Sequence, residues 1–112
     1  TYKAHHTKNA RTAAETWLPR CDGAVILSDQ SDSEEGIVGV PHEGKEEYNN
    51  IWQKVRSIWK YVHHAYASHF DWFVIGGDDL FVVAPNLRAY LRSGEITAAA
   101  AGDTPLFLGR RC

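Results

Sequence analysis

The stretch that decides the fold is DWFVIGGDDLFVV, residues 71–83. After its first position the run 71–75 is entirely apolar, which predicts a strand buried in a sheet. Gly76 and Gly77 follow this run and allow the backbone to leave the strand and approach a ligand closely. Asp78 and Asp79 come next, so the sequence predicts two carboxylates at the carboxyl end of a strand.

Ligands of α/β sheets bind at the carboxyl ends of the strands, so Asp78 and Asp79 are candidates for a binding site. Adjacent carboxylates repel each other unless a cation lies near them, and oxygen ligands favour a hard metal such as Mg²⁺ or Mn²⁺. A polar turn in which one aspartate caps the next helix explains the same residues, and both interpretations stay open at this point.

The segment 46–69 carries the clearest periodicity of the chain. Its apolar residues recur at steps of three and four, which predicts a helix of about six turns with one apolar stripe. These residues are Tyr48, Ile51, Trp52, Val55, Ile58, Trp59, Val62 and Tyr66.

Shorter patterns on both sides complete an alternation of helices and strands. Pro19 marks the end of an Ala-rich helix expected within 2–19, and Pro41 follows the second of two short apolar strands. The further elements expected are strands at 24–28, 37–40 and 106–108, an acidic loop at 29–36, and a helix at 86–92. Strands separated by helices predict an α/β fold with a largely parallel sheet.

Composition excludes several classes of protein. The chain has 112 residues, which suits one domain, and 12 Lys and Arg against 14 Asp and Glu give a net charge of −2, which argues against a general nucleic-acid binder. It has no apolar run of membrane-spanning length, and its first residues do not form a signal peptide.

The two cysteines, Cys21 and Cys112, have no metal-ligand spacing. An unpaired thiol and a disulfide to a cysteine outside this chain explain Cys21 equally well. Cys112 is the last residue, from which we expect that the natural protein continues beyond it. The six histidines form no HExxH motif, and GxSxG, Walker and GxGxxG motifs are absent.

Three segments together resemble the fringe-like glycosyltransferases, and most of all their core 1 β1,3-galactosyltransferase branch. They read EEYNNIWQKVRSIWKYV at 46–62, DWFVIGGDDLFVVAPNLRAYL at 71–91 and PLFLGRR at 105–111. Thr16-Trp17 and Arg20-Cys21 fit a further family segment that precedes a strand. The resemblance covers residues 2–111.

This resemblance implies that residues 1–112 form an incomplete GT-A domain, a Rossmann-like nucleotide-sugar-binding fold, and supply its donor- and metal-binding half. It implies Asp79 as the ligand of Mn²⁺ or Mg²⁺, and Asp78, Lys54 and Arg110 as contacts of the UDP-sugar. For Lys54 the alternative stays open that it is a solvated residue beside a core Trp52. For 109–111 the alternative of a plain turn stays open. The family has a third acid where this chain has Gly77, which weakens the acidic motif.

The implied activity is inverting transfer of galactose from UDP-galactose, in β1,3 linkage, to O-linked N-acetylgalactosamine on glycoproteins. The family's base lies in a later part of the domain, so we expect no catalytic residue within this chain and no transfer by the chain alone. The resemblance also implies a type II membrane protein of the Golgi lumen whose anchor lies outside this sequence, and it allows a homodimer.

Two alternatives remain at the level of sequence. A non-enzymatic folding partner of such transferases is suggested by the lost acid at Gly77. A Mg²⁺-dependent phospho-acceptor receiver domain also places paired acids at a strand end, but it needs a later strand ending in lysine, which is absent here.

Overall fold

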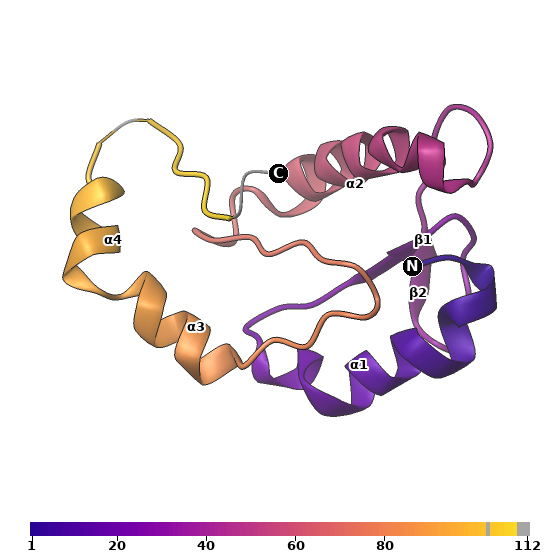
Figure 1. Cartoon of the computed structure of the whole chain (residues 1–112), viewed down its shortest axis with the longest axis horizontal. Coiled ribbons are helices and arrows are strands. Elements are labelled where there is room, and N and C mark those ends of the chain that lie inside the picture. Colours follow the sequence, from indigo (N-terminus) through magenta and orange to yellow (C-terminus); the bar gives the residue numbers. More distant parts are fainter. Residues whose placement is uncertain (103, 110–112) are drawn as a thin grey trace. The chain divides into compact units, whose positions relative to one another are not determined.

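The computed structural model describes residues 1–102 and 104–109 and divides into two compact units, Thr1–Phe81 and Val82–Cys112. The first unit contains the elements η1 to α2 and the second contains α3 and α4 (Figure 1). The predicted mixed α/β composition is confirmed, because helices accompany a small parallel sheet.

A helical run opens the first unit, as predicted for 2–19. It passes through a 3₁₀ turn, a π-helical segment and an α-helix before a second 3₁₀ turn. The elements are η1 (Lys3–His5), η2 (His6–Ala10), α1 (Arg11–Thr16) and η3 (Leu18–Arg20). The α-helix α1 ends earlier than predicted, at Thr16, and Pro19 lies instead in the first turn of η3, where the missing N–H costs no hydrogen bond.

The two predicted strands form a parallel pair, β1 (Ile26–Ser28) and β2 (Ile37–Gly39). Leu27 and Ile37 are buried. An antiparallel bridge between Asp32 and Ile37, with backbone hydrogen bonds of 2.9 and 2.8 Å, folds the acidic loop back onto β2. Gly36 completes this turn at φ +65°, a conformation that favours glycine.

The predicted strand at 71–75 is wrong. Among the residues that the structure describes, only β1 and β2 form a sheet, and 72–75 belong to no strand or helix. An apolar run becomes a strand only when a neighbouring strand accepts its backbone hydrogen bonds, and in the described residues β1 and β2 pair with each other and not with 71–75. Val74 is 57% exposed, so the expected burial fails as well. Residues 106–108 also form no strand.

The predicted long helix is α2 (Ile51–Tyr66), preceded by η4 (Tyr48–Asn50) and therefore shorter than 46–69. Its burial differs from the prediction, because Lys54 is buried whereas Trp52 is 57% exposed. A core Trp52 beside a solvated Lys54 is thus wrong. Lys54 turns inward because its Nζ donates to Glu46 Oε1 at 2.5 Å and to the carbonyl oxygen of Thr1 at 2.5 Å.

The second unit contains α3 (Ala84–Leu91) and α4 (Gly94–Ala99). Pro85 lies in the first turn of α3, and the helix corresponds to the one predicted at 86–92. Ser93 caps α4 through its hydroxyl oxygen, which accepts from the Ile96 N–H at 3.4 Å. No helix in the described part of the chain is long and apolar enough to cross a membrane.

A network of the side chains of His42, Glu46 and Lys54 joins the loop before η4 to α2. His42 Nε2 lies 2.7 Å from Glu46 Oε2, and the other oxygen of Glu46 binds Lys54. The hydrogen bond to Glu46 raises the pKa of His42, helped by the carbonyl of Glu43 and opposed by partial burial and by Lys54. Protonated His42 therefore stabilises the folded form.

This network makes a prediction about pH. Because the pKa of His42 is raised on folding, its contribution is fully present below about 6.5, the ordinary histidine value, and is lost as the pH rises through the folded-state pKa. Urea unfolding should show His42→Gln to be less stable than wild type by about 0.5 kcal/mol at pH 5.5. The difference should shrink toward pH 8.5, and a difference that grows with pH would contradict the assignment. The matched control is His63→Gln, on an exposed position of α2.

Candidate functional site

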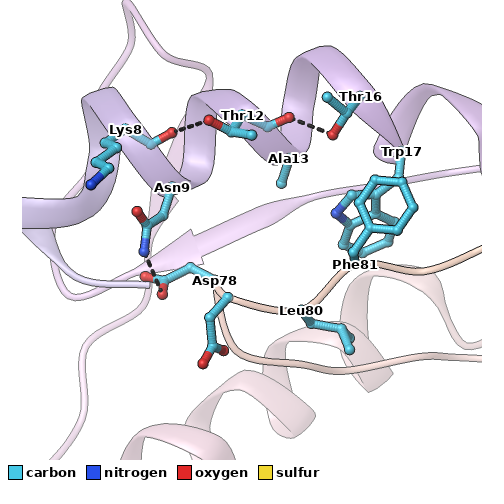
Figure 2. A pocket seen from close by; sticks show the side chains of 10 residues that line it. Lys8, Asn9, Thr12, Ala13, Thr16, Trp17, Asp78, Leu80 and Phe81 are labelled. Atoms are coloured by element: carbon cyan, nitrogen blue, oxygen red, sulfur yellow. Dashed lines mark hydrogen bonds between the residues drawn. The ribbon is translucent and has the colours of Figure 1, made fainter.

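A pocket of about 360 Å³ lies within the first unit, between the N-terminal helical run and the GGDD turn (Figure 2). Residues of η2 and α1, with Trp17 directly after α1, form one wall. Four consecutive residues of the turn form the other. The lining residues are Lys8, Asn9, Thr12, Ala13, Thr16, Trp17, Asp78, Asp79, Leu80 and Phe81. The pocket thus contains the two aspartates singled out by the sequence.

The helical wall carries one positively charged side chain, that of Lys8. Thr12 Oγ1 donates to the carbonyl of Lys8 at 2.7 Å, and Thr16 Oγ1 donates to the carbonyl of Thr12 at 2.6 Å, so both hydroxyl protons are used within the helix (Figure 2). Lys8 is exposed, and its ammonium group forms no hydrogen bond or ion pair with residues 1–102 or 104–109. It is therefore available to an anionic ligand.

Asp78 is bound by side chains of the helical run. His5 Nδ1 lies 2.9 Å from Asp78 Oδ2, and Asn9 Nδ2 donates to Asp78 Oδ1 at 3.3 Å. Partial burial raises the pKa of Asp78, but the hydrogen bonds from Thr1, His5 and Asn9 outweigh it, so that the pKa lies below its ordinary value. Asp78 is therefore an ionised carboxylate whose two oxygens both have partners.

Asp79 lines the same pocket as an exposed carboxylate without a hydrogen-bond or ion-pair partner in the described ranges. The turn that presents it is closed by a hydrogen bond of 3.2 Å from the Leu80 N–H to the Gly77 carbonyl. A Cβ on Gly77 would lie 2.7 Å from Asp79 Oδ1. The glycine therefore leaves the space in which the Asp79 carboxylate lies.

These residues fit a divalent cation that brings ligands of its own. Within the described residues no cluster of three or more His, Cys, Asp or Glu side chains could enclose a metal. Mg²⁺, however, is commonly held by one or two carboxylates together with substrate phosphates and water. Asp79 would be one such carboxylate, and Lys8, which lines the same pocket, carries the positive charge that a phosphate would require.

The other predicted site residues lie elsewhere. Lys54 does not line the pocket, and its ammonium group is held by Glu46 and by the Thr1 carbonyl. Its nucleotide contact stays a prediction, as does that of Arg110, which lies outside the described residues together with Cys112. Among the described residues, Cys21 is a half-buried thiol without a disulfide partner.

Sequence reasoning missed His5, Lys8 and Asn9. Metal-binding spacing does not single out His5, which belongs to no such motif. The signal that could have found it is the spacing of His5 and Asn9, which places both side chains on one face of a helix. That spacing indicates a shared partner but does not identify it as Asp78.

Comparison with known proteins supports the resemblance drawn from the motifs. Over 110 residues the chain is 30% identical to glycoprotein-N-acetylgalactosamine 3-beta-galactosyltransferase 1 of Xenopus laevis. The match covers 97% of this chain and 26% of that protein, so the chain spans about a quarter of the relative's length. No family model matches the chain, and no solved structure matches it. The resemblance to this galactosyltransferase branch is thus confirmed at the level of a fragment, and the chain is related along nearly its whole length to part of a glycosyltransferase.

Proposed function

We propose that this chain is part of a metal-dependent, inverting glycosyltransferase with a GT-A fold. The protein transfers galactose from UDP-galactose, in β1,3 linkage, to O-linked N-acetylgalactosamine on glycoproteins. The observation that carries the proposal is the unpartnered Asp79 carboxylate in a pocket that Lys8 also lines. The match of 97% of this chain to part of a galactosyltransferase supports a sugar-nucleotide ligand for that pocket.

The residues of the pocket suit the donor end of this reaction. As galactose leaves UDP, negative charge grows on the diphosphate, and a bound Mn²⁺ or Mg²⁺ supplies the charge that neutralises it. Asp79 would hold the cation. Lys8, with three N–H donors, would bind a phosphate oxygen of the same ligand.

The remaining parts of the proposal concern groups beyond this pocket. Inversion needs a base that accepts the proton of the acceptor hydroxyl, and we assign that base to the part of the domain that this chain does not include. By the same relation to Golgi transferases we propose the Golgi lumen as the location, reached as a type II membrane protein. The macromolecular partner is the glycoprotein acceptor, with no role for nucleic acid.

The test is calorimetric titration of UDP into the intact protein, with and without Mn²⁺. Binding should require the metal, and Asp79→Asn should weaken it by about tenfold or more, equivalent to about 1.4 kcal/mol per tenfold. Glu34→Gln removes an exposed carboxylate of the acidic loop, away from the pocket lining, and should leave the affinity unchanged. UDP binding that ignores Mn²⁺ and survives Asp79→Asn would remove the metal site from the proposal.

A further inference from the structure

Both oxygens of Asp78 are engaged by one short stretch of helix. His5 Nδ1 lies 2.9 Å from Asp78 Oδ2, and we assign the proton of this contact to the imidazole nitrogen, with the carboxylate oxygen as acceptor. The amide of Asn9 takes the other oxygen at 3.3 Å. Asn9 Nδ2 also lies 3.4 Å from His5 Nδ1, but both of these groups donate to Asp78, so we assign no hydrogen bond between them.

The structure also fixes the direction of His5. The ring of Tyr2 lies against the imidazole, with centroids 4.2 Å apart and planes at 48°. The side chain of His5 is 37% exposed and that of Asp78 is 16% exposed, so their contact is partly shielded from water. A packed ring and two hydrogen bonds make this a defined attachment between the turn and the helical segments η1 and η2.

The turn needs such an attachment because its own backbone is permissive. Gly76 and Gly77 have no side chains to restrict the approach to Asp78 and Asp79. The two hydrogen bonds to Asp78 anchor the turn beside the helical run, next to the wall of the pocket that Asp79 also lines. Asp79 is then the carboxylate that remains for a ligand.

We propose that His5 and Asn9 are positioning residues that bind Asp78 and thereby present Asp79 to a divalent cation in the pocket. The inference rests on the proposed function for the cation's role, and it adds two residues that the family motif does not contain. Asp78 acts here through Asp79, in place of the nucleotide contact that the resemblance implies for it. The site is accordingly a one-carboxylate site completed by water or phosphate.

The experiment measures binding of Mn²⁺ alone to the intact protein by the loss of the free-ion signal in electron paramagnetic resonance. Five variants are compared with wild type, namely His5→Ala, His5→Gln, Asn9→Ala, Asp78→Asn and the double variant His5→Ala/Asp78→Asn. His5→Ala and Asp78→Asn should each weaken Mn²⁺ binding by about tenfold. His5→Gln should recover most of that loss, since its amide N–H can donate to the same oxygen.

The double variant separates positioning from a general structural role. If His5 acts through Asp78, then the double variant binds Mn²⁺ no more weakly than Asp78→Asn alone. Losses that multiply in the double variant, or a wild-type affinity in His5→Ala, would overturn the proposal. His64→Ala, on an exposed position of α2, is the matched control and should bind as wild type does.

Failure of the positioning role of His5 can be distinguished from failure of the proposed function. If Mn²⁺ binds with the pattern above but UDP does not bind with it, the positioning role stands and the proposed donor is wrong. If Mn²⁺ does not bind to wild type at all, the positioning role is overturned. Thermal unfolding of each variant confirms that a loss of Mn²⁺ binding does not come from a lost fold.

Discussion

Replacing His6 with alanine is expected to lower the free energy of unfolding by about 3 kcal/mol, the largest stability effect that we predict for a single side chain. His6 is 1% exposed. Its Nε2 lies 2.7 Å from Ser28 Oγ, and its Nδ1 lies 3.1 Å from Asp32 Oδ2. The ring therefore ties η2 to the end of β1 and to the acidic loop.

The hydrogen-bond inventory shows why this side chain has no simple substitute. Ser28 is also 1% exposed, and its only hydroxyl proton goes to Asp29 Oδ1 at 2.9 Å. The His6 ring thus bonds the Ser28 hydroxyl group through Nε2 and the Asp32 carboxylate through Nδ1. Alanine leaves a buried cavity and removes both of these hydrogen bonds. The hydrogen bond from His6 is also the main cause that lowers the pKa of Asp32.

Urea unfolding measures this effect directly. His64→Ala is the matched control, because it removes an exposed histidine, and it should change stability by no more than about 0.5 kcal/mol. If His6→Ala is as stable as His64→Ala, then the buried network does not hold the N-terminal helical run to the sheet.

The largest effect on activity is expected for Asp79→Asn in the intact protein. Removing one preorganised electrostatic contact to developing charge typically costs about 10²–10³-fold in rate, and we expect a loss of that size in kcat/KM for galactose transfer. The amide keeps the shape of the side chain but loses the charge that holds the cation. Glu34→Gln should retain full activity, because its exposed carboxylate does not line the pocket. Transfer by Asp79→Asn within threefold of wild type, about 0.7 kcal/mol, would remove Asp79 from the reaction.

Local patterns were sufficient to predict β1, β2 and α2. The strands are short apolar runs between turn residues, and they pair with each other within one loop of chain. The helix follows from apolar residues at steps of three and four. In each case the information that selects the structure lies within the segment or beside it.

The failures at 71–75 and at Lys54 have a common physical cause. Whether an apolar run pairs as a strand depends on an edge supplied elsewhere in the chain, which periodicity does not report. Lys54 is buried because the carboxylate of Glu46 and a backbone carbonyl at residue 1 receive its ammonium group. Periodicity predicts an exposed lysine, because it contains no information about partners elsewhere in the chain.

The candidate site likewise contains residues that the sequence predicts and residues that only the fold brings together. The family-like motif identified Asp78 and Asp79 as candidate site residues, and both line the pocket. His5 and Asn9 lie 73 and 69 positions from Asp78 along the chain, so their contact with it arises only from the fold.

The most direct test of the proposed activity is a transfer assay with the intact protein. UDP-galactose, Mn²⁺ and a peptide carrying O-linked N-acetylgalactosamine are incubated with wild type, and the product is analysed by mass spectrometry and by digestion with a linkage-specific β-galactosidase. We predict a β1,3-galactosylated peptide that forms with Mn²⁺ and not with a chelator. Absence of product, where the Xenopus relative forms it under the same conditions, would contradict the proposed activity, and restoration of a related transferase by this protein would identify a folding partner instead.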